Sequence, residues 1–203
     1  MPNQFIIAGI GTEIGKTLIS AIFRQGMQAD YWKPVQSGNP EEADALFIGQ
    51  MTRVPEGKIW DSSYMLTQPL SPHTAAEIDG IRISLDHIQL PLTERSLIVE
   101  LAGGLMVPLN ESETNLDLIA HIALPVILVS KNYLGSINHT LLSYEILKAK
   151  QIPIAGIVFN GPANASGERF ILQHTGLKVL LRVPELAQIN PEIIQEYAQQ
   201  IQF

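Results

Sequence analysis

A glycine-rich run near the N-terminus constrains the fold more than any other feature of the sequence. It reads Gly9-Ile10-Gly11-Thr12-Glu13-Ile14-Gly15-Lys16-Thr17 and lies between a short apolar run and a segment with helical spacing of apolar residues. Glycines let the backbone curl so that N–H groups point at phosphate oxygens, and a following helix adds the positive end of its dipole. In such a loop we expect Lys16 to reach the β- and γ-phosphates of a nucleotide and Thr17 to bind Mg²⁺.

The spacing of this loop departs from the general phosphate-loop motif. The motif has four residues between its outer glycines, whereas Gly9 and Gly15 enclose one more. The alternative is a strand-to-helix turn in which Gly-Lys-Thr occurs by chance. The apolar run before the loop and the helical pattern after it favour a phosphate loop.

Short apolar runs alternate with longer amphipathic runs along the chain, as in βαβ units. We predict an α/β fold, a doubly wound, mostly parallel sheet with helices on both faces, of the P-loop NTPase type, with residues 1–203 as a single domain. The predicted strands are residues 4–8, 31–35, 96–100, 125–130, 154–159 and 179–183. The predicted helices are residues 16–28, 41–51, 136–149 and 166–174, and residues 52–80 are interpreted as an ordered connection near the active site.

Ligands of α/β sheets bind beyond the carboxyl ends of the strands. Three charged residues lie in or near the predicted strand ends and helix starts of this chain. Lys33 lies in a predicted buried strand and needs an anionic neighbour, unless it lies at an edge and reaches water. Glu100 ends an apolar strand, as the acid of a Walker B pattern does, although a solvent-facing glutamate would give the same pattern. Asp44 begins a helix beside Glu41 and Glu42, and stabilisation of the helix dipole is a sufficient explanation for it from the sequence alone.

Composition excludes several classes of protein. The formal charge of −7 argues against binding to nucleic acid, which requires clustered Lys and Arg. No apolar run reaches the roughly 20 residues of a membrane helix, and the first residues lack the features of an export signal. The absence of cysteine fits a cytoplasmic protein. His121 and His139 lack metal-ligand spacing, so we predict no zinc site.

The motifs together resemble those of the dethiobiotin synthetase family. Nearly the whole chain takes part in the resemblance. The matching segments are the lengthened loop with its Thr12-Glu13 insert, Trp32-Lys33-Pro34-Val35-Gln36-Ser37-Gly38, Asp44-Ala45-Leu46, Ser71-Pro72-His73, Val99-Glu100-Leu101-Ala102-Gly103-Gly104, Leu134-Gly135-Ser136-Ile137-Asn138-His139 and Gly156-Ile157-Val158-Phe159-Asn160. The longer loop, unusual for the general motif, is the form that this family uses.

The resemblance implies an ATP-dependent ligase that makes dethiobiotin from 7,8-diaminononanoate and CO₂. An amine of the substrate takes up CO₂, the carbamate attacks the γ-phosphate of ATP, and the second amine closes the ureido ring. By the same resemblance Lys16 and Lys33 are catalytic, and Thr17, Asp44 and Glu100 bind Mg²⁺. The nucleotide-binding residues would be Glu13, Ile14, Gly15, Lys16, Thr17, Leu18, Asp44, Glu100, Leu101, Ala102, Gly103, Asn160, Gly161, Pro184, Glu185 and Leu186, with Glu192 on the ribose.

The resemblance also implies a homodimer whose substrate site is completed by the partner subunit. Thr12, Ser37 and Pro72 would contact the substrate, and Asn138 would hold its far carboxylate in trans. Two positions depart from the family pattern next to the predicted phosphate and metal contacts. Leu101 replaces a glycine that often follows the acid, and Ile10-Gly11 replaces a more polar pair.

Two other functions remain as alternatives. Amidoligases and cobyrinate-type synthetases share this chemistry, but the glutaminase domain that they usually carry does not fit in 203 residues. A switch ATPase of the partition or septum-positioning type would have a second lysine where this chain has Gly11. Residues 191–203 also lack the basic face expected for docking on a membrane.

Overall fold

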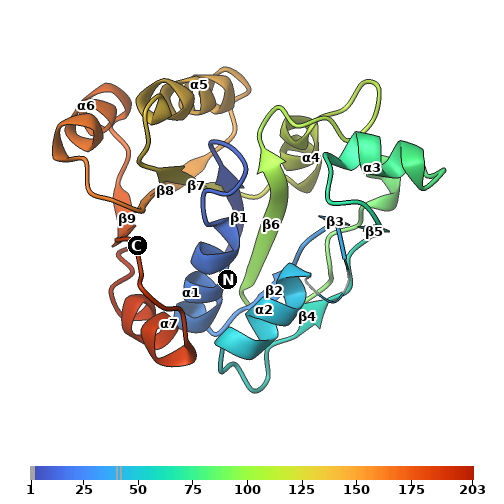
Figure 1. The fold of residues 1–203 in the computed structure, drawn as a ribbon, viewed down its shortest axis with the longest axis horizontal. Coiled ribbons are helices and arrows are strands. Elements are labelled where there is room, and N and C mark those ends of the chain that lie inside the picture. Colours follow the sequence, from blue (N-terminus) through green and yellow to red (C-terminus); the bar gives the residue numbers. More distant parts are fainter. Residues whose placement is uncertain (1–2, 40, 42) are drawn as a thin grey trace.

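The fold is described from a computed structural model covering residues 3–39, 41 and 43–203. Within these residues seven strands form one sheet in the order β4-β2-β6-β1-β7-β8-β9, and all of its neighbouring strands are parallel (Figure 1). The strands are β1 (Gln4–Gly9), β2 (Asp30–Trp32), β4 (Ile59–Trp60), β6 (Leu97–Gly104), β7 (Val126–Lys131), β8 (Ile154–Asn160) and β9 (Val179–Val183). A second, two-stranded sheet joins β3 (Val35–Ser37) to β5 (Tyr64–Leu66).

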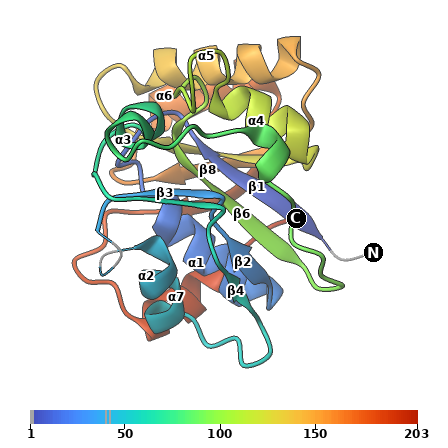
Figure 2. The same ribbon diagram turned by 90° about the vertical axis from the view of Figure 1, so that its right-hand side faces the viewer.

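Helices cover both faces of the large sheet, which explains why its central strands are almost wholly apolar. In Figure 2, α1, α2 and α7 lie on one side and α3, α4, α5 and α6 on the other. Their bounds are α1 (Lys16–Met27), α2 (Asp44–Met51), α3 (Pro72–Ile78), α4 (Asn115–Ile122), α5 (Ser136–Ala149), α6 (Ala165–Thr175) and α7 (Pro191–Ala198), with a short 3₁₀ helix, η2 (Leu85–His87). The predicted doubly wound α/β fold is therefore confirmed. Among the described residues, no helix has both the length and the apolar character needed to cross a membrane.

The predicted strand 31–35 is wrong as a single element. The chain leaves the large sheet after Trp32 and enters the small sheet at Val35. Pro34 has no N–H group for a ladder hydrogen bond, so the strand cannot continue through it. The break frees Lys33 from the sheet at the carboxyl end of β2.

The third predicted strand is longer than expected. β6 continues from Glu100 through Gly104, so Glu100 lies inside the strand rather than at its tip. The pairing of β6 with β1 shifts register between Ile7 and Gly9, and Gly9 then pairs with Gly104. This irregularity lets β6 run on beside the start of the glycine-rich loop.

Several elements were missed in the sequence. Residues 52–80, interpreted as a connection, contain β4, β5 and α3, which are too short to show a hydrophobic period. The helices α4 and α7 were also missed, although each has a capping signal. Thr114 and Asp117 form a capping box at α4, and Asn190 caps α7 just before Pro191. Of the predicted helix 41–51, Glu42 lies outside the described residues, and α2 begins at Asp44.

Candidate functional site

The glycine-rich loop curls between the end of β1 and the start of α1, as predicted. Lys16 Nζ donates to the carbonyl of Gly11 at 2.9 Å, so the lysine folds back over the loop. Gly15 has φ +88°, and a Cβ there would lie 2.2 Å from Nδ2 of Asn160. A side chain at that position would collide with Asn160, and Gly15 turns the loop into the N-terminus of α1, where backbone N–H groups favour an anion.

Two carboxylates and three side-chain donors converge beside the loop. Lys33 forms an ion pair with Asp44, and its Nζ lies 3.5 Å from Oε1 of Glu100. Thr17 Oγ1 contacts Asp44 and lies 2.8 Å from the same Oε1. The hydroxyl of Tyr31 donates to the other oxygen of Glu100, Oε2, at 2.9 Å. The structure thus brings together Lys33, Asp44, Thr17 and Glu100, which are far apart in the sequence.

Burial and charge set the protonation of this cluster. Burial alone would lower the pKa of Lys33, but the carboxylates of Glu100 and Asp44 outweigh it and raise that pKa above its ordinary value. Burial acts to raise the pKa of Asp44, yet the Lys33 charge and hydrogen bonds from Lys33, Thr17 and Gln36 keep it below its ordinary value. Lys33 is therefore an ammonium and Asp44 a carboxylate near neutral pH.

Lys16 and Tyr31 respond differently to the same surroundings. Burial, assisted by the nearby Lys33 charge, lowers the pKa of Lys16 to about 8, although Glu100 and Asp44 oppose the change. Burial and the charges of Glu100 and Asp44 hold the pKa of Tyr31 well above its ordinary value. The Tyr31 hydroxyl is thus a permanent donor, whereas Lys16 gives up its proton more easily than an ordinary lysine.

The oxygen atoms of this cluster suit a hard divalent cation. The hydroxyl oxygen of Thr17 lies at hydrogen-bond distance from one oxygen of Asp44 and one oxygen of Glu100. Thr17 has a single hydroxyl proton, so it can donate to only one of these two oxygens at a time. The described residues contain no group of three His, Asp or Glu side chains that could hold a metal by itself. Mg²⁺ in nucleotide sites needs fewer protein ligands, because phosphates and waters complete its shell. Thr17, Asp44 and Glu100 fit that requirement.

A hollow of about 490 Å³ opens from this cluster toward α3. Three of the four predicted substrate residues, Thr12, Ser37 and Pro72, line it together with Lys33. The Ser37 hydroxyl is buried and has no hydrogen-bond partner in the described structure. This hollow offers a polar end at Lys33 and Ser37 to a small substrate.

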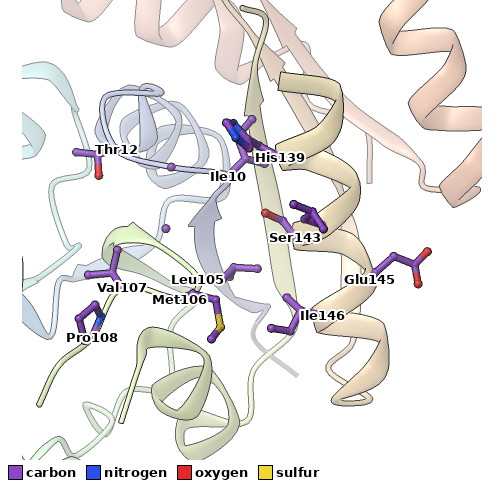
Figure 3. Close-up of a pocket in the computed structure, with 13 residues that line it drawn as sticks. Ile10, Thr12, Leu105, Met106, Val107, Pro108, His139, Ser143, Glu145 and Ile146 are labelled. Carbon is purple, nitrogen blue, oxygen red and sulfur yellow. The ribbon is translucent and has the colours of Figure 1, made fainter. Parts of the chain in front are cut away.

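Asn138 lies apart from that hollow. It lines a separate depression of about 750 Å³ beside the start of α5, with Tyr133, Leu134 and Pro162. A third hollow, of about 720 Å³ and mostly apolar, separates α5 from the glycine-rich loop and the segment after β6 (Figure 3). Figure 3 shows His139, Ser143 and Ile146 of α5 on one side of it and Met106, Val107 and Pro108 on the other. Within one chain, the structure does not bring Asn138 to the other predicted substrate residues.

The predicted nucleotide-binding residues lie around the loop and the ends of β8 and β9. Asn160 ends β8, donates from Nδ2 to the carbonyl of Ile14 at 2.7 Å, and pairs in register with Val183. Gly161 N donates to Val183 O at 2.9 Å, so the segment Pro184, Glu185, Leu186 starts next to Asn160. Glu13 has a left-handed backbone within the loop, and Leu18 lies in the first turn of α1.

The remaining residues predicted to contact the nucleotide are spread over three different surroundings. Ala102 and Gly103 line the hollow beside Lys33, whereas Leu101 faces the core and is 1% exposed. Glu192 forms an exposed ion pair with Arg53 at 2.6 Å at the start of α7. His121 lies 3.1 Å from the carbonyl oxygen of Ile88, and Nδ1 of His139 lies 2.7 Å from the hydroxyl of Tyr133.

Sequence reasoning missed two residues that hold the site together. Tyr31 reads as an ordinary aromatic residue of a buried strand. Asn115, fully buried at the start of α4, donates from Nδ2 to the carbonyls of Ala102 at 2.6 Å and Gly104 at 2.9 Å. The capping box at Thr114 was the one signal that could have located the helix carrying Asn115.

The sequence is similar to known proteins over nearly its whole length. A family model described as an AAA domain matches residues 3–193. The chain is 45% identical over 199 residues to the ATP-dependent dethiobiotin synthetase of Christiangramia forsetii, covering 98% of this chain and 96% of that one. It is 49% identical over 197 residues to the protein of the same name from Cytophaga hutchinsonii, covering 97% and 95%.

Solved structures share the fold at low identity. A ParA family ATPase from Chlorobium tepidum is 12% identical with a TM-score of 0.53, and each chain is covered to 98%. The MinC:MinD cell division protein complex of Aquifex aeolicus is 10% identical with a TM-score of 0.54, covering 98% of this chain and 91% of that one. At such identities the likeness concerns the P-loop NTPase fold and not the activity.

Proposed function

The chain belongs to the ATP-dependent dethiobiotin synthetase family, and we propose that it makes dethiobiotin from 7,8-diaminononanoate, CO₂ and ATP with Mg²⁺. It is an ATP-dependent ligase of biotin biosynthesis. One observation carries the assignment of the site. The buried Lys33 ammonium, the Lys16 loop and the carboxylates of Asp44 and Glu100 meet at one end of a hollow suited to a small substrate.

In this proposal ATP binds with its phosphates on the glycine-rich loop. Lys16, now folded onto Gly11, turns to the β- and γ-phosphates, and the backbone amides at the α1 N-terminus face the same oxygens. Thr17, Asp44 and Glu100 would hold Mg²⁺, which supplies positive charge to the phosphates when bound. Asn160 and the segment from Pro184 to Leu186 form the site for the base, because β8 and β9 end side by side.

Lys33 serves the chemical step. One amine of the substrate attacks CO₂ and loses a proton, giving a carbamate in the hollow lined by Thr12, Ser37 and Lys33. A carbamate oxygen then attacks the γ-phosphate, forming the mixed carbamic-phosphoric anhydride and releasing ADP. Because two anions approach each other, fixed cations at the point of contact lower the barrier. Lys33 and Lys16 are the cations that the chain itself supplies there.

Ring closure follows in the same hollow. The second amine attacks the carbamoyl carbon and displaces inorganic phosphate, so that no bond to the protein forms at any stage. The positive charges that assisted phosphorylation also favour departure of the phosphate. The hydroxyl of Ser37, which has no hydrogen-bond partner among residues 3–39, 41 and 43–203, is available to the carbamate oxygen throughout.

A homodimer explains the position of Asn138. Leu142 and Met106 expose much of their apolar surface around the hollow between α5 and the segment after β6, and the exposed Leu134 lies in the depression that also holds Asn138. A second copy of the chain seated on this surface would bury it and bring its own α5 toward the substrate hollow. Asn138 of the partner subunit would then hold the far carboxylate of the substrate.

The proposal includes a single domain and a cytoplasmic location. We infer that residues 1–203 act as one P-loop domain, because strands from both ends of the chain share the large sheet. A cytoplasmic location fits a chain without cysteine.

Substrate-coupled release of ADP tests the proposed reaction. We expect the purified chain to release ADP in the presence of Mg²⁺ only when 7,8-diaminononanoate and bicarbonate are both present, with dethiobiotin formed in equal amount. Omitting either substrate is the matched control. ADP release that ignores both substrates, or that responds to an unrelated dicarboxylate instead, would refute the proposed substrate.

A further inference from the structure

Tyr31 is a fully buried side chain that the proposed reaction does not use. It lies in β2, beside β6, and pairs in register with Ile98. Glu100 follows Ile98 by two residues, so its side chain projects from the same face of the sheet. The register therefore brings the Tyr31 ring alongside Glu100.

The two oxygens of Glu100 have different partners. Oε2 accepts the Tyr31 hydroxyl at 2.9 Å, whereas Oε1 lies 2.8 Å from Thr17 and 3.5 Å from Lys33. Glu100 is 1% exposed and Tyr31 has no exposed surface, so water does not compete for Oε2. Only Oε1 faces the atoms that would surround a cation.

We propose that Tyr31 is a positioning residue for the metal site, whose hydroxyl holds Glu100 so that a single oxygen, Oε1, faces the cation. This inference rests on the proposed Mg²⁺ site and adds to it a residue outside the ligand set. Torsion about the last bond of a glutamate side chain is soft, so a buried carboxylate without a second anchor can turn toward Lys33. Hydrogen bonds to the rear of a ligand prevent such motion and strengthen metal binding.

The test is Mg²⁺ affinity in the presence of ADP, measured by calorimetry on the whole chain. We expect Tyr31→Phe, which keeps the ring, to weaken Mg²⁺ binding to the ADP complex roughly tenfold. Binding of ADP without metal should stay within about twofold of the unmodified protein, because the hydroxyl of Tyr31 bonds Glu100 and no described atom of the glycine-rich loop. A Tyr31→Phe chain with unchanged Mg²⁺ affinity would overturn the proposal.

Tyr64→Phe is the matched control. Its hydroxyl accepts a hydrogen bond from the backbone of Ser84 at 3.1 Å, outside the cluster. Loss of this hydroxyl should leave Mg²⁺ affinity unchanged even if it lowers stability. Equal weakening by both changes would identify a general effect of lost tyrosine hydroxyls and would contradict a specific role for Tyr31.

Two further variants separate positioning from packing. If Tyr31 acts through Glu100, Tyr31→Phe has no additional effect on Mg²⁺ affinity once Glu100→Gln is present, and the double-mutant cycle detects this coupling. Tyr31→4-aminophenylalanine restores a donor at the same place and should recover most of the affinity. Should Tyr31→Phe fail to fold, Tyr31→4-methylphenylalanine fills the lost volume without a donor, and the same tenfold weakening is expected of it.

The outcomes also distinguish this inference from the proposed function. An unmodified chain whose ADP binding does not respond to Mg²⁺ contradicts the proposed metal site itself. An unmodified chain that binds Mg²⁺ with ADP, paired with a Tyr31→Phe chain that binds it equally well, contradicts only the role of Tyr31.

Discussion

The Lys33 ammonium lies 3.5 Å from Oε1 of Glu100, a residue 67 positions further along the chain. The contact exists because β2 ends at Trp32, which frees Lys33 from the sheet, while β6 carries Glu100 past the same point. Asp44 pairs with the same ammonium from the first turn of α2. Both carboxylates thus contact the same ammonium.

Replacing Lys33 should stop turnover without removing nucleotide. We expect Lys33→Ala to lower kcat for dethiobiotin formation by about 10²- to 10³-fold, the usual effect of losing one group that stabilises transition-state charge. Affinity for ADP, measured by calorimetry, should change little, because Lys16 and the loop amides remain. The free energy of unfolding should fall by up to about 3 kcal/mol, since two carboxylates lose their partner.

Lys58→Ala is the control for the Lys33 prediction. The Lys58 ammonium lies over the ring of Trp60 and comes just before β4, at the opposite end of the parallel strands from Lys33, and its loss also removes one positive charge. It should leave kcat unchanged. Loss of both ADP binding and turnover in Lys33→Ala would instead indicate that Lys33 is a structural residue.

Nucleotide binding should depend on pH through Lys16. Burial lowers the pKa of this lysine to about 8 in the nucleotide-free protein, and bound phosphates would raise it again. Affinity for ADP should therefore be constant below pH 8 and fall as the pH rises above it, with about one proton taken up per ADP bound near pH 9. Calorimetry in buffers of different ionisation enthalpy measures this uptake.

The same shift has a consequence for stability. Between about pH 8 and 10.5 the unfolded chain holds a proton on Lys16 that the folded chain has lost, so the contribution of this group to stability rises with pH across that window. Below pH 8 both states are protonated and the contribution of Lys16 is constant. Lys16→Gln should abolish both the proton uptake and the pH dependence of affinity, and a variant that retained them would assign the effect to another group.

Gly103 should be far less tolerant of a side chain than a comparable glycine elsewhere. Its φ is +78°, and a Cβ there would lie 2.8 Å from Cγ2 of Val107 and 3.4 Å from the hydroxyl of Thr12. Gly103→Ala should therefore disturb the wall of the substrate hollow, raising KM for 7,8-diaminononanoate and lowering the free energy of unfolding by about 2 kcal/mol. Steady-state kinetics and urea unfolding measure the two effects.

Gly80→Ala separates backbone strain from contact with the site. Gly80 has a similar φ of +67°, but a Cβ there meets no atom within 4 Å. This variant should lose about 1 kcal/mol of stability through strain alone and keep its KM. If Gly103→Ala had no greater effect than Gly80→Ala, Gly103 would have no part in shaping the hollow.

Parts of the site built from residues close together in the sequence could be predicted, whereas parts built from distant residues could not. The glycine-rich loop is a run of neighbouring residues, so its spacing and flanks were enough to predict Lys16 and Thr17 as contacts of phosphate and metal. The local sequence could not show that Asp44 does more than stabilise a helix dipole. Its partner Lys33 is free to contact it because β2 ends before Pro34, and the sequence pattern predicted a continuous strand there. Likewise, the contact of Tyr31 with Glu100 depends on the register of β2 with β6, which the sequence of one strand cannot reveal.

The elements that were missed also have physical explanations. β4 and β5 are only two and three residues long, and they exist because β2 and β3 offer them partners. The extension of β6 beyond Glu100 uses Ala102 and the two glycines that follow, residues with little strand preference of their own. It is stabilised by pairing with Gly9 and by the buried amide of Asn115, contacts that only the folded chain supplies.

Charge on the exposed face of α5 should separate the proposed dimer. Leu142 is 61% exposed on the apolar hollow that a second copy would cover, and a buried unpaired carboxylate there is unfavourable. We expect Leu142→Glu to raise the dimer dissociation constant about 30-fold or more, the effect of a typical interface hot spot, as sedimentation equilibrium would measure. Phe170→Glu, with 53% exposure on α6, should leave the dimer intact. Because Asn138 is proposed to act in trans, turnover by Leu142→Glu should recover as protein concentration rises, and activity independent of concentration in a proven monomer would refute a shared site.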